Sequence, residues 1–241
     1  MQSGLYVSLS AQLALRKRVD TIANNVANMN TAGFRADEVR FQALVEKAGS
    51  DSIAFASTGS EYISRRIGGM TRTNNPLDVA VQGDGWFAVK TPGGTTYTRD
   101  GRMQLSETGT LQNVQGYQML DAGGTPLVID PAAGPPTIAS DGMISQNGNQ
   151  VGAIGLFKID DQAKLSRSNF GGVVPDKPAT AVLDFAQNGV VQGFVENANV
   201  NPVMEMTKLI MVSHDFDGVS SMIQSSESSL TEAIKTLGSL T

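Results

Sequence analysis

Apolar residues near the beginning of the chain recur at intervals of three and four positions, the spacing that lines one face of a helix. The pattern predicts a helix from about Gly4 to Asn30, with Ser8 and Gln12 as polar interruptions. Gly33 can adopt the left-handed conformation that ends a helix. At 1.5 Å per residue this helix would be roughly 40 Å long. We expect its apolar stripe to be an assembly interface made of Leu5, Leu15, Val19, Ile22, Val26 and Met29.

A second apolar stripe, near the end of the chain, alternates threes and fours without a slip, which is the coiled-coil period. Asn201 suits the N-cap of a helix, Pro202 its first position, and Glu205 complements the helix dipole. A helix from Pro202 to Leu237 would be about 54 Å long. We expect the interface on this helix to comprise Leu209, Val212, Phe216, Val219, Ile223, Leu230 and Leu237.

The second helix is rich in serine and contains Gly218, and its stripe includes the small residues Ser226 and Ala233. Serine costs several tenths of a kcal/mol relative to alanine, and glycine about 1 kcal/mol. We therefore expect this helix to gain order only when it packs against others. Residues 1–35 carry four basic residues and one acidic residue, a net charge of +3, whereas 196–241 carry two basic and six acidic residues, a net charge of −4. Opposite charges favour pairing of the two helices.

The middle of the chain follows a different pattern, because nearly all glycines and prolines lie between residues 36 and 195. Short apolar or alternating runs there are separated by Asp-Gly and Asn-Gly dipeptides, which are strong hairpin signals. The dipeptides begin at Asp84, Asp100, Asp141, Asn147 and Asn188.

These patterns predict an α+β protein in which long N- and C-terminal helices pair as a coiled-coil domain around a central antiparallel β-rich domain. We expect residues 1–35 and 196–241 to form an inner assembly domain and 76–195 a β-rich outer domain. Residues 36–75 fit neither pattern and are predicted to be an extended connector.

Candidate chemistry is sparse. The chain has no cysteine and a single histidine, His214, so thiolate and two-histidine metal sites are excluded. A formal net charge of −5 gives no support to nucleic-acid binding. We expect no catalytic residues, no metal, no cofactor and no small-molecule substrate. Carboxylates can meet in space without a sequence pattern, so a secreted enzyme acting on peptidoglycan stays open as an alternative.

The N-terminus has the reverse order of a secretory signal, because the apolar segment 5–15 precedes the basic run 16–18. No apolar stretch approaches the roughly 20 residues that span a bilayer, so membrane insertion is not expected. The protein is either cytoplasmic or exported by a route that cleaves no signal peptide.

Four segments resemble the rod, hook and hook-associated axial proteins of the bacterial flagellum, and together the resemblance covers nearly the whole chain. They are residues 22–35, residues 75–87, residues 97–101 together with 109–111, and residues 192–202. The signature positions within them are Asn24, Asn25, Asn28, Thr31, Gly33, Phe34, Asn75, Pro76, Leu77, Asp78, Gly83, Gly85, Phe87, Asn199, Val200 and Asn201.

The resemblance implies a structural subunit that polymerises with itself and with other rod subunits around a central channel. It further implies export through the flagellar type III apparatus, a location in the periplasmic rod of the basal body, and transmission of torque. The chain is short for a hook protein and lacks the extra stretch of distal-rod subunits, which favours a proximal-rod subunit, with a distal-rod subunit as the alternative. Where the family has an Arg-x-Tyr-like segment on its last helix, this chain has His214 and Phe216.

Overall fold

The computed structural model describes residues 2–40, 43–48, 51–56, 59–169 and 171–238, and at 2–6, 43–48, 51–56, 230, 233 and 237 it describes the backbone alone. The chain divides into two compact units. The helical unit comprises Met1–Ala27, Asp37–Tyr62 and Asn201–Thr241, and the β unit comprises Asn28–Ala36 and Ile63–Val200.

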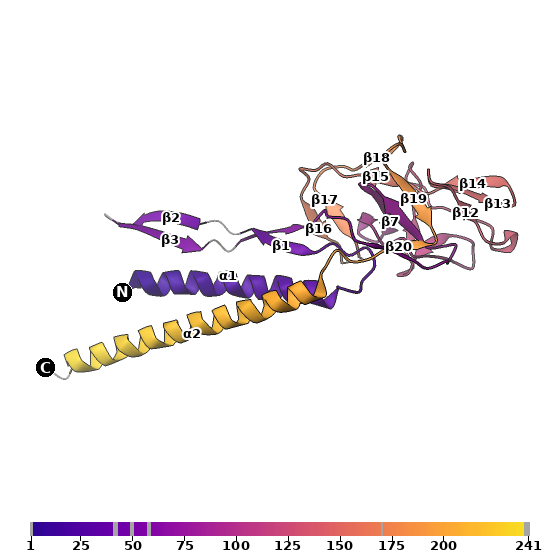
Figure 1. Cartoon of the computed structure of the whole chain (residues 1–241). Coiled ribbons are helices and arrows are strands. Elements are labelled where there is room, and N and C mark those ends of the chain that lie inside the picture. The colour runs from indigo at the N-terminus through magenta and orange to yellow at the C-terminus, as the bar shows by residue number, and fades with distance from the viewer. Residues whose placement is uncertain (1, 41–42, 49–50, 57–58, 170, 239–241) are drawn as a thin grey trace. The chain divides into compact units, whose positions relative to one another are not determined.

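Both predicted helices are confirmed. The first, α1, spans Gln2–Ala27, and the second, α2, spans Pro202–Gly238 (Figure 1). The Asn201 side chain caps α2 by accepting a hydrogen bond from the Met204 amide at 3.1 Å. Helix α1 ends a few residues earlier than predicted because Asn28 to Phe34 form successive turns, in which Gly33 has the expected positive φ of 66°.

The predicted pairing of the helices as a coiled-coil domain is wrong, although the α+β class is confirmed. A coiled coil would bury its seam along the whole overlap. Among the predicted seam side chains that the structure describes, only Ile22 and Val212 are fully buried. The apolar surface of α2 is instead spread over several sides of the helix, since its exposed residues include Val203, Met204, Met206, Ile210, Met211 and Met222.

The segment predicted to be an extended connector, 36–75, contains strands. They are β1 (Asp37–Arg40), β2 (Ala43–Ala48), β3 (Asp51–Ala56), β4 (Ser60–Ile63) and β5 (Met70–Arg72). β1 pairs with β4, β2 with β3, and β5 with β20 of the β unit. In the helical unit, Lys17 of α1 forms an ion pair with Glu61 of β4 at 2.7 Å. The role of this segment as a connector stays a prediction.

The remaining strands belong to the β unit, and every pairing that the structure describes among them is antiparallel. They are β6 (Val79–Gln82), β7 (Gly85–Thr91), β8 (Gly94–Thr98), β9 (Met103–Leu105), β10 (Leu111–Asn113), β11 (Gln118–Met119), β12 (Thr137–Ile138), β13 (Met143–Gln146), β14 (Asn149–Ala153), β15 (Leu156–Lys158), β16 (Leu165–Arg167), β17 (Val173–Pro175), β18 (Thr180–Ala181), β19 (Gly189–Gln192) and β20 (Phe194–Glu196). One sheet follows the order β16-β17-β8-β7-β11-β10-β9, with β15 joining β7 and β18. Separate sheets are formed by β12-β13-β14 and by β19-β6.

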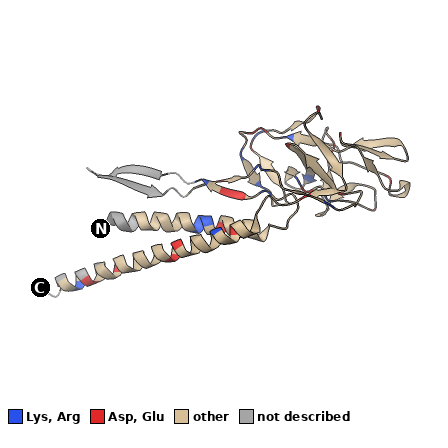
Figure 2. Cartoon of the chain, viewed as in Figure 1, with Lys and Arg blue, Asp and Glu red and all other residues tan. Residues whose placement is uncertain are grey.

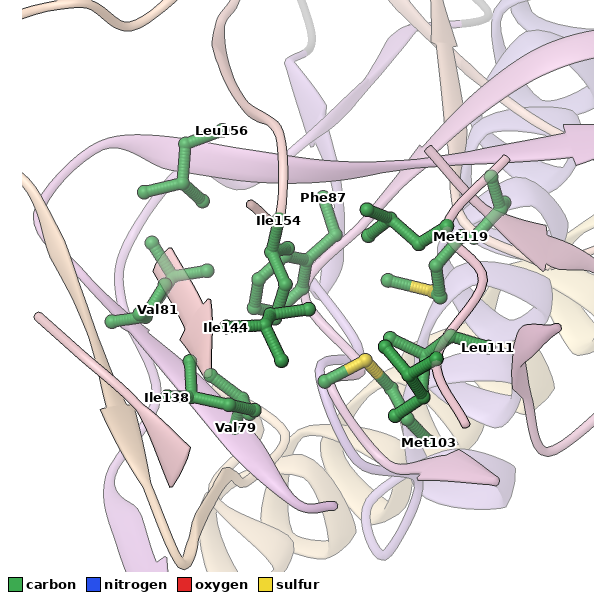
Figure 3. Close-up of a cluster of buried hydrophobic side chains, with 14 of the residues drawn as sticks. Val79, Val81, Phe87, Met103, Leu111, Met119, Ile138, Ile144, Ile154 and Leu156 are labelled. Carbon is green, nitrogen blue, oxygen red and sulfur yellow. The ribbon is translucent and has the colours of Figure 1, made fainter. Parts of the chain in front are cut away.

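Strand β7 is buried on both faces, as its continuous apolar run suggests. Phe87 and Val89 point into the main core, where Phe87 lies among side chains from several strands (Figure 3). Trp86 and Ala88 belong to two smaller clusters. Because consecutive residues of a strand face opposite sides, one strand contributes to more than one cluster.

The turn dipeptides have different outcomes. Asn147 and Gly148, with φ angles of 50° and 80°, form the hairpin between β13 and β14, as predicted. The hairpin reading of Asp84-Gly85 is wrong, because β6 pairs with β19 and not with β7. The three apolar residues of β6 are fully buried, so its position is decided by packing and not by the adjacent turn.

Candidate functional site

The two helices of the helical unit contact each other side by side and run antiparallel. Asn25 of α1 contacts Glu205 near the start of α2, whereas Gln12 donates a hydrogen bond to Ser220 further along α2 at 3.4 Å. Basic residues concentrate on α1 and acidic ones on α2 (Figure 2). The structure therefore brings α1 and α2 together along part of their length.

The predicted interface residues fall into three groups. Ile22 and Val212 are buried. The half-buried members are Leu15, Val19, Val26, Met29, Leu209, Phe216, Val219 and Ile223. The side chains of Leu5, Leu230 and Leu237 lie outside the described residues. The role of all these positions in assembly stays a prediction.

Asn25 connects α1, β1 and α2 through its side chain and is almost fully buried. Its amide nitrogen donates to the backbone oxygen of Asp37 at 2.9 Å and to Oε2 of Glu205 at 3.3 Å, while its amide oxygen accepts from the Asp37 backbone amide at 2.8 Å. Asn24 donates to the Asp37 carboxylate at 2.5 Å, and Lys208 lies 2.5 Å from the other oxygen of Glu205. A buried polar network with its groups paired can fix one alignment of neighbouring elements.

Within the β unit, the segments 33–36 and 196–199 bind each other, and we call this contact the junction clasp. The Gly33 amide donates to the Glu196 carbonyl at 2.7 Å, and the Asn199 amide donates to the Phe34 carbonyl at 3.1 Å. The Ala36 amide donates to the side-chain oxygen of Asn199 at 2.6 Å. A Cβ at Gly33 would lie 2.2 Å from the backbone nitrogen of Asp100, so this position requires glycine for space as well as for φ.

A buried ion cluster lies behind the junction clasp. The Glu196 carboxylate is 2.8 Å from Arg35 and 3.6 Å from Arg99, and all three side chains are at most 2% exposed. It also accepts a hydrogen bond from the Gly68 amide at 3.0 Å. Both guanidinium groups lie over the ring of Trp86, at 5.6 and 5.4 Å from its centroid, where a cation is attracted to the ring face.

Burial lowers the pKa of Arg99 to about 10 and also lowers the pKa of Arg35, while the Glu196 carboxylate opposes both shifts. At neutral pH the cluster therefore contains two cations and one anion. Removing one partner of a buried pair leaves an uncompensated charge, which is strongly destabilising. Arg35, Arg99 and Glu196 lie inside the signature segments, but no sequence pattern singles them out. Charged side chains within these segments were the available signal.

The signature segment 75–87 shapes the start of the β unit. Asn75 donates to the Asp78 carboxylate at 3.0 Å and accepts from the Leu77 amide, and the Pro76 carbonyl accepts from Gln192. The Gly83 carbonyl accepts from the Arg99 guanidinium at 2.6 Å, which links this segment to the ion cluster.

The other signature residues are also placed. Phe87 lies in the core, and a Cβ on Gly85 would be 3.3 Å from Leu156. Asn28 accepts a hydrogen bond from the Thr31 hydroxyl at 3.3 Å. Val200 is half-buried and precedes the helix-capping residue Asn201.

Among the described residues, no cluster of histidine, aspartate or glutamate side chains could hold a metal ion. None of the helices described has an apolar stretch sufficient to cross a membrane. His214 is exposed on α2.

Three family models match the chain. They are described as "Flagella basal body rod protein" for residues 5–35, "Flagellar hook protein FlgE/F/G D1 domain" for 80–146 and "Flagellar basal body rod FlgEFG protein C-terminal" for 191–236. Together with the fold, these matches define an axial protein of the flagellar rod and hook class, which confirms the resemblance seen in the sequence.

Full-length relatives narrow this class. The chain is 49% identical to the flagellar basal-body rod protein FlgF of Mesorhizobium japonicum, over 99% of each chain, and 34% identical to FlgF of Caulobacter vibrioides, over 100% of each. It is 29% identical to the rod protein FlgG of Bacillus subtilis, over 97% of this chain and 98% of the relative. The chain belongs to the FlgF family of flagellar basal-body rod proteins and is a structural subunit of the flagellar rod.

Proposed function

We propose that the chain polymerises with further copies of itself and with other rod subunits to form the proximal part of a drive shaft that crosses the periplasm and transmits torque. The observation that carries this proposal is the uncovered apolar surface of α2, where Val203, Ile210 and Met222 are each more than half exposed. Large exposed apolar surfaces mark interaction sites. Burying one such side chain in an assembly stabilises it by about 1.5–3 kcal/mol.

In this proposal, residues 1–35 and 196–241 form the inner assembly domain, 76–195 form the outer domain, and 36–75 connect them. The apolar positions predicted on α1 and α2 that are not buried within the chain, as Ile22 and Val212 are, would contact helices of neighbouring subunits. The serine-rich α2 would gain most of its stability from those contacts, because its intrinsic helix propensity is low.

Export through the flagellar type III apparatus without cleavage of a signal peptide completes the proposal. It is supported by the order of apolar and basic residues in α1, which is the reverse of a secretory signal.

The test is made in the bacterium that produces the chain. Deleting the gene should abolish swimming, and the chain should be recovered in purified basal bodies. Replacing exposed Ile210 with aspartate should lower that recovery, whereas Leu183→Asp, at an 85% exposed position of the β unit, should not. Normal swimming of the deletion strain, or basal bodies without the chain, would contradict the proposal.

The proximal position is tested separately from rod membership. Three relatives named FlgF, which are 49%, 44% and 34% identical to this chain, are more similar to it than the two relatives named FlgG, which are each 29% identical, and this supports the proximal assignment. Antibody labelling of isolated basal bodies should mark the end of the rod nearer the inner membrane. Label at the hook-proximal end would favour the distal-rod alternative.

A further inference from the structure

The chain passes between its two compact units at four points, and the parts of the β unit next to these points are bound to one another. The passages follow Ala27, Ala36, Tyr62 and Val200. A force that travels along the covalent chain from the helical unit therefore enters the β unit through three segments, which are 28–36, 63–69 and 196–200.

Asn199 binds the three segments together. Its backbone amide donates to the Phe34 carbonyl at 3.1 Å, and its side-chain oxygen accepts from the Ala36 amide at 2.6 Å. Its side-chain nitrogen donates to the Arg66 carbonyl at 2.7 Å. The Ala36 carbonyl in turn accepts from the Ser64 amide at 2.8 Å. One residue thus joins every segment through which the chain enters or leaves the β unit.

Glu196 forms a second set of bonds among the same segments. Its carbonyl accepts from the Gly33 amide at 2.7 Å, and its carboxylate lies 2.8 Å from Arg35 and accepts from the Gly68 amide at 3.0 Å. Because the Glu196 and Arg35 side chains are each 1% exposed, water does not compete for their bonds while the fold is intact.

The two segments of the junction clasp run in the same direction. Gly33 binds Glu196, and the next residue, Phe34, binds Asn199, so residue numbers rise together along both segments. The chain enters the first segment from residue 28 and leaves the second at residue 200. Pulling these two ends apart slides the segments past each other and loads all of their hydrogen bonds at once. In an antiparallel pair, the same pull would break the bonds one after another and at a lower force.

We propose that the junction clasp carries the mechanical load of the β unit, because it resists forces that arrive along the chain from α1 and α2. This inference rests on the proposed function, in which torque is the load on a rod subunit. It gives the clasp a role that differs from its contribution to equilibrium stability.

Single-molecule pulling on the purified full chain tests the proposal. The chain contains no cysteine, so handles can be attached through Asn30→Cys and Val203→Cys, at exposed positions on either side of the clasp. At a fixed force, adding Asn199→Ala should make the chain unfold about tenfold faster, because two side-chain hydrogen bonds are lost from the clasp.

Ile144→Val is the matched control, because Ile144 is buried in the main core on β13. It should reduce stability in urea about as much as Asn199→Ala does, yet change the rate of unfolding under force by less than about twofold. A second control attaches the handles through Asn149→Cys and Leu183→Cys, at exposed positions outside the clasp. With these handles, Asn199→Ala should change the rate by less than about twofold.

The bacterium that produces the chain provides a test under natural load. The Asn199→Ala chain should be recovered in purified basal bodies in the wild-type amount, because the exposed apolar surface of α2 is unchanged. In dilute medium the cells should swim as the wild type does. As the viscosity of the medium rises, the fraction of swimming cells should fall below that of the wild type.

The outcomes separate this inference from the proposed function. If Asn199→Ala accelerated unfolding no more than Ile144→Val, with the handles flanking the clasp, the mechanical role would be refuted and the rod assignment would stand. Equal acceleration with both pairs of handles would also refute it, as would unchanged swimming in viscous medium. Absence of the wild-type chain from basal bodies would instead refute the proposed function.

Discussion

Replacing Glu196 with glutamine should destabilise the β unit strongly. The substitution keeps the size of the side chain but removes the only anion within 4.0 Å of Arg35 and Arg99 among the described residues, at 2.8 and 3.6 Å. Because the three side chains are at most 2% exposed, water cannot replace the lost charge. Breaking a buried pair typically costs about 3–5 kcal/mol.

Urea unfolding followed by tryptophan fluorescence is a suitable assay, because the single tryptophan of the chain, Trp86, lies against both guanidinium groups. With a denaturant dependence of about 2 kcal/mol/M, the midpoint should fall by about 2 M. The Lys177 and Asp160 pair is the control, since these side chains are 45% and 51% exposed and 3.6 Å apart. Lys177→Gln should leave the midpoint nearly unchanged, because an exposed ion pair contributes little to stability.

A second variant separates charge from packing. Combining Glu196→Gln with Arg99→Met removes one of the two cations left unpaired, and should recover part of the lost stability. If Glu196→Gln lowered the free energy of unfolding by no more than the Lys177 control, the ion cluster would not be buried in solution and the reasoning would be refuted.

Three further predictions concern single residues. Gly33→Ala should lower the free energy of unfolding by more than about 2 kcal/mol, because a Cβ would collide with the Asp100 backbone and φ is positive; an unchanged thermal midpoint would contradict this. Asn25→Ala should lower the free energy of unfolding of the helical unit by about 2–3 kcal/mol, because Glu205 and the Asp37 backbone would lose hydrogen bonds. Helical circular dichroism during a urea titration measures this change. Burial lowers the pKa of Arg99 in the folded state to about 10, below its ordinary value, so the unfolded state binds more protons than the folded state only above about pH 10. The stability difference between the wild type and Arg99→Met should therefore stay constant from about pH 6 to 9 and change in favour of the wild type above about pH 10; a change near neutral pH would refute this.

Local signals in the sequence were sufficient to predict the two helices and some of the turns. Asn201 caps α2 as expected because an N-cap depends only on the next few residues. Asn147-Gly148 forms its hairpin because both residues accept a positive φ. The Asp84-Gly85 hairpin failed because the partner of β6 is β19, more than a hundred residues later in the chain. A turn dipeptide contains no information about such a distant partner.

The signature segments contain nearly all residues of the junction clasp and of the buried ion cluster, but they do not reveal that Glu196 binds Arg35 and Arg99. Gly33 was recognised as a helix stop, whereas its close approach to Asp100 appears only in the folded β unit. Arg35, Arg99 and Glu196 are far apart in sequence, and nothing in their spacing indicates that they meet. Long-range ion pairs are set by tertiary packing, so a sequence without aligned relatives does not reveal them.

The sequence by itself determined the class of the fold, the existence of both terminal helices, the N-cap of α2, the family, and the scarcity of residues suited to catalysis. These properties depend on periodicity, local conformational preference and composition, which are readable one segment at a time. The tertiary structure alone decided that the helices do not bury a continuous seam, that β6 pairs with β19, and that one glutamate holds two buried arginines. Each of those outcomes depends on apolar contacts and ion pairs between residues that are far apart in the sequence. Such contacts form only when the whole chain has folded.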